Sequence, residues 1–209
     1  MTPDPHASFD TVVYDFGNVL VGWDPYAGFP GRPRAEVDAW MAEIDFPAFN
    51  HAQDAGRTWS DARAALADRP HLRPLLDEYV ANFARTLTGP VPGSAALVDE
   101  LRAAGLRLLG LTNWSAELFE HAAPAAPATR LMDDVVVSGR VGLAKPDPAI
   151  FAHLVATHDV DPSRTVFVDD SPANVAAAES LGFRTVRFTD TPALRAALSA
   201  LGLPVTAPS

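Results

Sequence analysis

The sequence contains no cysteine in its 209 residues. Disulfide bonds, thiolate catalysis and cysteine metal sites are therefore excluded. No apolar run approaches the roughly 20 residues of a membrane-spanning helix, so we expect no membrane partner. The opening Met1–His6 lacks the basic and apolar regions of a secretion signal, which favours a cytoplasmic protein.

Positive charge is also scarce, because 16 Lys and Arg face 26 Asp and Glu and the formal net charge is −10. The few basic residues form no block, which argues against a nucleic-acid surface. An acidic chain can still bind phosphate where a metal ion, a lysine and helix N-termini supply local positive charge. The sequence therefore leaves phosphate chemistry open while it excludes nucleic acid as a partner.

Alternation of strand and helix patterns along the chain predicts an α/β fold. Five apolar runs rich in Val, Leu and Phe indicate parallel strands that are buried on both faces. They cover residues 11–16, 106–112, 134–138, 165–169 and 184–188. Helical patterns follow at 93–104, 114–122, 147–157, 172–181 and 191–201, and Gly105 and Gly182 stand where helices should end. The expected architecture is a doubly wound, Rossmann-like parallel sheet.

The first connection is too long for an ordinary crossover, and no strand pattern is evident between residues 20 and 92. Helical patterns at 32–44, 59–68 and 72–87 instead predict a small α-helical cap, inserted directly after the first strand. We expect the cap at 23–89 and the catalytic core at 1–22 and 90–209, with Pro-rich hinges at 24–33 and 88–93. The predicted hydrophobic core of the cap comprises Trp40, Met41, Ile44, Phe46 and Phe49.

Asp15 ends the first predicted strand, where open α/β sheets place their active sites. A carboxylate there can attack phosphorus and form an aspartyl-phosphate. Gly17, two residues later, allows a ligand to approach the backbone and could turn its carbonyl toward a metal ion. The alternative is a plain strand followed by a turn, in which Asp and Asn serve as turn residues.

Two later segments would supply groups that bind phosphate. Thr112 and Asn113 end the second core strand, where a hydroxyl and a free amide would hold phosphate oxygens, although both residues could simply cap a helix. Lys145 lies between Ala144 and Pro146 and could neutralise a nucleophile and a phosphate, or it could be a solvated loop lysine.

Asp169 and Asp170 close the fourth core strand as an acidic pair. Adjacent carboxylates at a strand end are costly unless a cation compensates them, and Mg²⁺ prefers such hard oxygen ligands. The alternative is that Asp170 or Ser171 caps a helix beginning at Pro172. Both interpretations can hold, because one carboxylate can cap the helix while the other binds metal.

Taken in order, these motifs resemble the haloacid dehalogenase-like hydrolases, in particular the subgroup with a helical cap between the first two motifs. The resemblance extends from Phe9 to Phe188, and the stretch Gly142–Pro148 makes it specific. It implies that Asp15 is the nucleophile, that Thr112 and the Asn113 amide hold phosphate, and that Lys145 offsets charge. It also implies a Mg²⁺ site made by Asp15, the Gly17 carbonyl and Asp170, with Asp169 acting through water.

One position departs from the family pattern. Phosphatases of this family usually carry a second aspartate two residues after the nucleophile, and this residue protonates the leaving group and then activates water. Gly17 stands there instead. General acid–base catalysis contributes roughly 10²–10⁴-fold, so its loss should be felt.

Three functions remain open at this stage. The first is a Mg²⁺-dependent phosphomonoester hydrolase acting on a small metabolite, with sugar phosphates among the candidates and with water, the substrate or a cap residue moving the proton. The second is a metal-independent 2-haloacid dehalogenase, which needs no leaving-group proton. The third is a catalytically weak binding protein. Dehalogenases of this family carry Ser-Ser-Asn-type residues at the Asp169–Asp170 position and a tyrosine at Gly17, so the acidic pair favours the phosphatase.

Substrate selection is expected from the cap and from the loop after Leu20, in a protein that is either a monomer or a homodimer. Trp114 is the best placed candidate, because it follows the phosphate-binding Asn113, although it could equally pack in the core. His51 is a candidate for the missing acid–base group. Arg32 and Arg34 lie near the start of the cap, where a dehalogenase would need an arginine for its substrate carboxylate, but surface positions are favoured. The remaining candidates are Trp23, Asp24, Gln53, Asp54 and Arg57.

Overall fold

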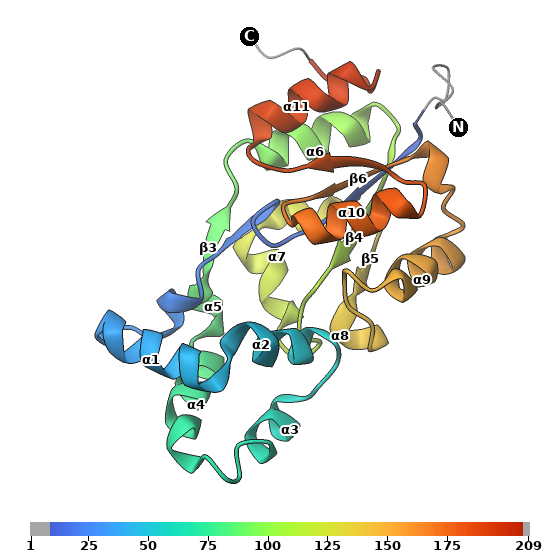
Figure 1. Ribbon diagram of the computed structural model, residues 1–209. Helices are drawn as coiled ribbons and strands as arrows, with labels where there is room; N and C mark the ends of the chain where they lie inside the picture. Colours follow the sequence, from blue (N-terminus) through green and yellow to red (C-terminus); the bar gives the residue numbers. More distant parts are fainter. Residues whose placement is uncertain (1–8, 207–209) are drawn as a thin grey trace.

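The computed structural model describes residues 9–206 of the chain. Residues 1–8, on which the expected lack of a secretion signal rests, lie outside the described part, as do residues 207–209. Figure 1 shows a sheet with helices on both sides and a group of further helices beyond one edge of it.

A five-stranded sheet forms the centre of the larger part, with the order β5-β4-β1-β6-β7 and parallel pairing throughout. The strand β1 (Thr11–Tyr14) lies between β4 (Arg107–Thr112) and β6 (Thr165–Asp169). The outer strands are β5 (Asp134–Val137) and β7 (Arg184–Arg187). All five predicted strands are therefore confirmed, and their carboxyl ends meet at one edge of the sheet.

Alternate residues of the strands serve two separate cores. Val12 belongs to the core covered by α6 (Ser94–Ala103) and α11 (Thr191–Ala200). Val13 belongs to the core covered by α9 (Pro148–His158) and α10 (Pro172–Ser180). Burial on both faces is what a continuous apolar strand requires, and the doubly wound sheet is confirmed (Figure 1).

Two predicted helix ends are explained by glycine. Gly105 and Gly182 adopt positive φ angles of 84° and 91°, which side chains with a Cβ disfavour. Each glycine follows its helix closely and turns the chain toward the next strand, as the sequence predicts.

A helical layer lies beyond the carboxyl edge of the sheet (Figure 1). It comprises α1 (Arg34–Ile44), α2 (Phe46–Asp54), α3 (Trp59–Ala64), α4 (Arg73–Ala81) and α5 (Phe83–Thr86), with the short 3₁₀ helices η1 (Pro25–Gly28) and η2 (Pro70–Leu72). We refer to this layer as the cap; the boundaries 23–89 stay a prediction.

The cap has an aromatic centre of its own. The Tyr79 side chain is fully buried, and its ring lies 5.4–6.2 Å from the ring centres of four other aromatic residues. These are Phe29, Phe46, Trp59 and Phe83. Of the predicted cap core, Trp40, Ile44, Phe46 and Phe49 are buried and Met41 is partly buried. Aromatic packing therefore forms the centre of the cap, while ion pairs such as Arg32–Glu78 and Arg63–Asp77 lie on its surface.

The cap region also contains elements that the sequence did not indicate. The expectation of no strand between 20 and 92 is wrong, because β2 (Val21–Trp23) and β3 (Leu87–Pro90) form an antiparallel ribbon. These strands are short and rich in Gly and Pro, so only pairing between distant segments defines them. The helix α2 was missed because it is short, its second half is mostly polar, and Asp45, with a φ of 53°, separates it from α1.

The predicted helix at 114–122 is also wrong. The chain there forms only η3 (Phe119–His121) and α7 (Ala122–Ala125). The Trp114 amide donates to Ser138 Oγ at 2.9 Å, and its carbonyl accepts from Gly139 N at 3.1 Å. These bonds attach the segment to α8 (Ser138–Val141) in place of helical bonds. Similarly, the predicted helix at 72–87 breaks at Asn82 into α4 and α5.

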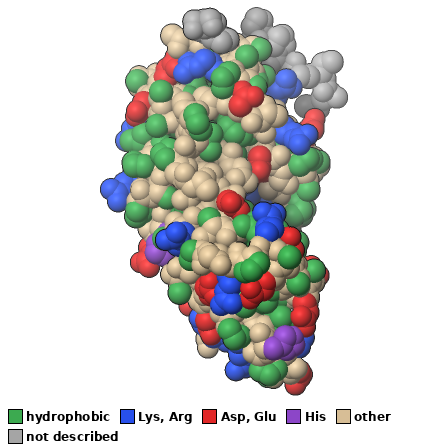
Figure 2. Space-filling view, turned by 90° about the vertical axis from the view of Figure 1, so that its left-hand side faces the viewer, with side chains coloured by type: hydrophobic (Ala, Val, Ile, Leu, Met, Phe, Trp, Pro, Cys, Tyr) green, Lys and Arg blue, Asp and Glu red, His purple; other side chains and the backbone are tan. Residues whose placement is uncertain are grey.

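No helix within residues 9–206 is long and apolar enough to cross a bilayer. On the face in Figure 2, positive and negative side chains are interspersed, and no block of Lys and Arg gathers there. Two further 3₁₀ helices, η4 (Pro127–Leu131) and η5 (Pro162–Arg164), complete the described elements.

Candidate active site

The predicted nucleophile and cation meet at the carboxyl edge of the sheet. Asp15 follows β1, and its Oδ1 lies 2.9 Å from Lys145 Nζ. The same ammonium group lies 2.6 Å from Asp169 Oδ2 and donates to the Leu111 carbonyl at 2.7 Å. The side chains from three distant motifs therefore form one buried ion cluster.

Lys145 is only 1% exposed, so the alternative of a solvated loop lysine is wrong. Asn113 fixes its backbone, because Asn113 Oδ1 accepts from Lys145 N and Asn113 Nδ2 donates to Lys145 O, each at 2.8 Å. The helix-cap alternative for Thr112 and Asn113 is also wrong, because no helix begins at these residues. Asn113 thus acts in this structure as the clamp that positions the lysine.

Asp169 is fully buried and saturated with donors. In addition to Lys145, its oxygens accept from Ser171 N at 2.9 Å and from Asn174 Nδ2 at 3.0 and 3.1 Å. Ser171 occupies the N-cap position of α10 but makes no side-chain cap bond. The buried carboxylate of Asp169 therefore orients Lys145 and the start of α10.

Three carboxylates converge where a cation would be needed. Asp15, Asp169 and Asp170 each offer an oxygen within 4.8 Å of the others. Burial, ahead of the neighbouring acids, raises the pKa of Asp15 to about 7 despite the charge of Lys145, and it raises the pKa of Asp170 as well. One lysine does not balance three acids, so this hard oxygen set fits a divalent cation such as Mg²⁺.

Lys145 responds in the opposite sense to its surroundings. Burial alone would lower its pKa, but the charges of Asp15 and Asp169 outweigh that effect and hold the pKa above its usual value. The lysine therefore keeps its charge in the cluster.

Gly17 and Asn18 form the turn that leads into the cap. A Cβ at Gly17 would meet no atom within 4 Å, so the position is open toward the pocket. Asn18 adopts a φ of 55°, accepts from Trp23 N at 3.1 Å and donates weakly to Asp170 Oδ2 at 3.5 Å. The turn interpretation of this segment and its place at the site therefore both hold.

Thr112 contributes differently from the other predicted residues. Its side chain is fully buried, and its hydroxyl has no hydrogen-bond partner among the described residues. A buried hydroxyl without a partner is costly, and an acceptor within its reach would satisfy it. Thr112 does not line the pocket described below, so its contact with phosphate stays a prediction.

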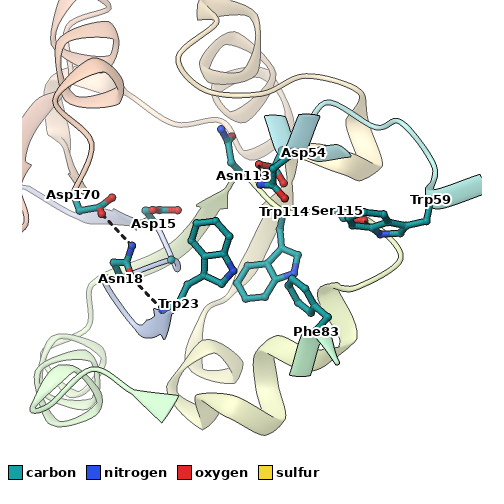
Figure 3. A pocket seen from close by; sticks show the side chains of 12 residues that line it. Asp15, Asn18, Trp23, Asp54, Trp59, Phe83, Asn113, Trp114, Ser115 and Asp170 are labelled. Atoms are coloured by element: carbon teal, nitrogen blue, oxygen red, sulfur yellow. Dashed lines mark hydrogen bonds between the residues drawn. The ribbon is translucent and has the colours of Figure 1, made fainter. Parts of the chain in front are cut away.

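A pocket of about 200 Å³ opens between this cluster and the cap. Figure 3 shows Asp15 and Asp170 on one side and aromatic side chains on the other. The pocket is lined by Asp15, Gly17, Asn18, Trp23, Asn50, Asp54, Trp59, Phe83, Asn113, Trp114, Ser115 and Asp170. This volume lies below the roughly 300–1,000 Å³ of typical ligand pockets, so the cavity is a small one.

Trp114 lines the pocket and also packs inside the molecule. Its ring meets the edges of Phe83 and Phe119, and its indole nitrogen has no partner in the described part of the chain. Trp114 therefore packs in the core, as one alternative predicted, and also lies where it could contact a substrate.

The other predicted specificity residues divide into two groups. Trp23 and Asp54 line the pocket. His51 is exposed and does not line it, so the structure gives no support to His51 as the missing acid–base group.

The remaining candidates lie away from the pocket. Arg32 pairs with Glu36 and Glu78, and Arg34 pairs with Asp38, in the surface positions that the sequence favours. Elsewhere, Asp24 caps η1, and Gln53 accepts from Arg57 at 2.5 Å inside the cap.

Sequence reasoning missed Asn50, Trp59, Phe83 and Ser115 as pocket residues. Phe83 falls within the predicted helix at 72–87, and the other three carry no motif. Trp59 Nε1 donates to Ser115 Oγ at 3.1 Å, and Trp59 N donates to Glu117 Oε2 at 2.8 Å. These bonds join the cap to the core, which no local pattern could reveal.

Comparison with known proteins identifies the family of this chain and two of its relatives. The family model of haloacid dehalogenase-like hydrolases matches residues 8–182. The sesquiterpene phosphatase of Aspergillus oryzae is 25% identical over 88% of this chain and 91% of its own length. A drimenol cyclase of Aspergillus calidoustus is 30% identical over 85% of this chain, which spans 33% of that longer protein.

Solved structures share the fold. A family enzyme from Bacteroides thetaiotaomicron, in complex with magnesium and inorganic phosphate, superposes with a TM-score of 0.71 at 18% identity, covering 88% of this chain and 95% of its own. The L-2-haloacid dehalogenase of Xanthobacter autotrophicus, with covalently bound chloropropionic acid, gives 0.62 at 22% identity, with 93% and 84% covered. Both similarities are evidence for the fold alone.

Proposed function

The chain belongs to the haloacid dehalogenase-like hydrolases, and on that premise we propose that it is a magnesium-dependent phosphomonoesterase for a small phosphorylated metabolite. The observation that carries the proposal is the cluster of Asp15, Asp169 and Asp170 around the buried Lys145. A halide displacement needs one carboxylate nucleophile, whereas this surplus of acids calls for a cation. The similarity to a sesquiterpene phosphatase supports the same reaction class.

In the proposed reaction, a carboxylate oxygen of Asp15 attacks phosphorus while the bond to the leaving oxygen breaks. Lys145 Nζ holds Oδ1 at 2.9 Å, which leaves Oδ2 free for the attack and fixes its direction. The same ammonium group offsets the charge that builds on the phosphoryl oxygens. Water then hydrolyses the aspartyl-phosphate and restores Asp15.

Asp15, Asp170 and the Gly17 carbonyl would hold Mg²⁺, with Asp169 acting through water. When bound, the ion supplies positive charge to the phosphate oxygens and to the nucleophile. Thr112 Oγ1 and the Asn113 amide would bind the remaining phosphate oxygens. This assignment gives the unpaired Thr112 hydroxyl an acceptor.

Selection of the rest of the substrate falls to the aromatic wall, which we define as Trp23, Trp59, Phe83 and Trp114. Aromatic faces pack against the apolar face of a sugar ring or against a hydrocarbon chain. The substrate panel should therefore contain both sugar phosphates and prenyl phosphates. Closure of the cap over the pocket would exclude bulk water during transfer.

Phosphate release from this panel, with Mg²⁺ and with EDTA, tests the proposal. We expect release that requires Mg²⁺ and is lost in Asp15→Asn. Halide release from 2-chloropropionate without metal, run in parallel, would replace the proposal with a dehalogenase. Silence in both assays would leave a binding protein that is catalytically weak because of Gly17.

A further inference from the structure

Resting on the proposed phosphatase function, we infer that the carboxyl group of Asp54, in the cap, replaces the acid–base aspartate that is missing at Gly17. Asp54 would protonate the leaving group and then accept a proton from the attacking water. Asp54 is the last residue of α2 and lines the same pocket as Asp15 (Figure 3). Three of the described lining residues are acids, and Asp15 and Asp170 belong to the metal cluster. Asp54 is therefore the lining acid that stays available to a leaving group.

The orientation of Asp54 is fixed from within its own helix. Asn50, one turn earlier, donates from Nδ2 to Asp54 Oδ2 at 3.1 Å. Among the residues that the structure describes, Oδ1 accepts no hydrogen bond, and the side chain is only partly buried. One oxygen is thus anchored while the other is free to meet a ligand in the pocket.

The position of Asp54 relative to the core is fixed by close backbone packing just after α2. Gly56 adopts a φ of 100°, and a Cβ there would lie 3.2 Å from Gly142 Cα and 3.4 Å from the Gly139 carbonyl. Both contacts are backbone atoms at α8, so any larger residue would push the cap outward. The Trp59 bonds to Ser115 and Glu117 hold the next turn of chain to the core. These contacts set the depth at which α2 presents Asp54.

The surroundings of Asp54 suit a group that both gives and takes a proton. Burial, followed by the charge of Asp15, raises the pKa of Asp54 to about 7, and the charge of Lys145 opposes this. Tyr79, buried beside it in the cap, is the further titratable group whose pKa Asp54 affects. Acid–base groups work best when their pKa lies near the operating pH.

The proposed steps balance as follows. Asp15 forms a bond to phosphorus, the phosphorus–oxygen bond to the alcohol breaks, and its electron pair stays on the alcohol oxygen. That oxygen takes the proton of Asp54, which becomes a carboxylate. Water then attacks phosphorus and gives a proton back to Asp54, while the electron pair of the Asp15–phosphorus bond returns to the Asp15 carboxylate. Phosphate leaves, and both acids return to their starting forms.

The test uses two classes of ester. An alkyl phosphate releases a strongly basic alkoxide that needs a proton, whereas 2,4-dinitrophenyl phosphate releases a stable anion that does not. Because kcat/KM includes steps only through transfer to Asp15, it isolates the first proton transfer. In Asp54→Asn, we expect kcat/KM to fall about 10²–10⁴-fold for the alkyl ester and less than about tenfold for the dinitrophenyl ester.

Two further variants sharpen the test. Gly17→Asp places an acid at the family position, where the structure leaves space, so adding it to Asp54→Asn should restore alkyl ester hydrolysis. Asp68→Asn, which neutralises an exposed acid of the cap, is the matched control and should leave both esters unchanged.

An equal loss for both esters in Asp54→Asn, with no rescue by Gly17→Asp, would overturn the inference and make Asp54 a packing or binding residue. That result would leave the phosphatase proposal intact, since the wild-type protein would still hydrolyse both esters. If the wild-type protein hydrolyses neither ester with Mg²⁺, the proposed function fails first.

Discussion

The two walls of the pocket are built by different physical means. On the core side, Asp15, Asn113, Lys145 and Asp169 are tied to strand ends by hydrogen bonds and ion pairs of 2.6–2.9 Å. On the cap side, Trp59 and Phe83 pack against the ring of Tyr79, and Trp59 also bonds to Ser115 of the core. Asp54 is anchored by Asn50 within α2.

This difference teaches where chemistry and selection reside. Buried charges keep their geometry only while every partner is present, so the core wall tolerates little change. Packed rings tolerate exchange at lower cost, so the cap wall can vary its substrate without loss of the reaction. Variants of the core wall should therefore lose the reaction itself, whereas variants of the cap wall should mainly change substrate binding and have smaller effects.

The largest effect is expected for Asp15→Asn, because it removes the nucleophile. Turnover of every ester should fall below detection, while circular dichroism and the midpoint of urea unfolding stay close to those of the wild type. Asparagine keeps the shape of the side chain and removes a carboxylate whose burial is costly. Normal activity in this variant would refute the proposed nucleophile.

Lys145→Met should abolish turnover as well and also destabilise the fold. Removing the cation leaves Asp15 and Asp169 without their shared partner, and breaking a buried pair costs about 3–5 kcal/mol. Urea unfolding measures this loss. The double variant Lys145→Met with Asp169→Asn should recover part of the stability and none of the activity. If it recovers no stability, the unpaired charge of Asp169 is not the cause of the destabilisation.

Asp170→Ala should weaken metal use with little change in stability, because Asp170 is partly exposed. The Mg²⁺ concentration for half-maximal activity should rise by at least about tenfold, the size of loss seen even for indirect partners of metal ligands. Asp99→Ala, at an exposed acid of the core, is the matched control. An unchanged Mg²⁺ titration in Asp170→Ala would remove this residue from the metal site.

The smallest effect is expected on the cap side for Trp59→Phe. It removes the 3.1 Å bond to Ser115 and keeps most of the ring packing. A hydrogen bond contributes about 0.5–1.5 kcal/mol, so KM should rise by up to about tenfold. The kcat should change little, because the Gly56 packing and the bond from Trp59 N to Glu117 still position Asp54. Ser115→Ala should have the same effect, and the double variant should add nothing. A loss of kcat as large as that in Asp15→Asn would erase the distinction between the two walls.

The sequence was sufficient for the sheet because its strands are continuous apolar runs, such as Thr11–Tyr14, closed by polar motif residues. The sequence-based prediction was wrong after Asn113, where Trp114 donates to Ser138 and accepts from Gly139 in place of the expected helical bonds. Local propensity cannot anticipate bonds to a segment some 25 residues away, which is the separation of Trp114 from Gly139. The ribbon of β2 and β3 was not predicted for the same reason, since it depends on pairing between distant segments.

The candidate site divides in the same way. Asp15, Lys145 and Asp169–Asp170 could be singled out because charged groups at strand ends stand out against apolar runs. Asn50, Trp59 and Ser115 could not, since each is ordinary in its own segment and becomes part of the site only where the cap meets the core.

By itself, the sequence determined the parallel sheet, the order of the motifs and the set of charged groups at its carboxyl edge. Burial pattern and residue chemistry are properties of short segments, so they can be read along the chain. Only the tertiary structure decided that Asn113 clamps Lys145, that His51 faces away, and that Asp54 stands over the nucleophile's pocket. Those outcomes depend on packing between segments far apart in sequence, where the cap and the core meet.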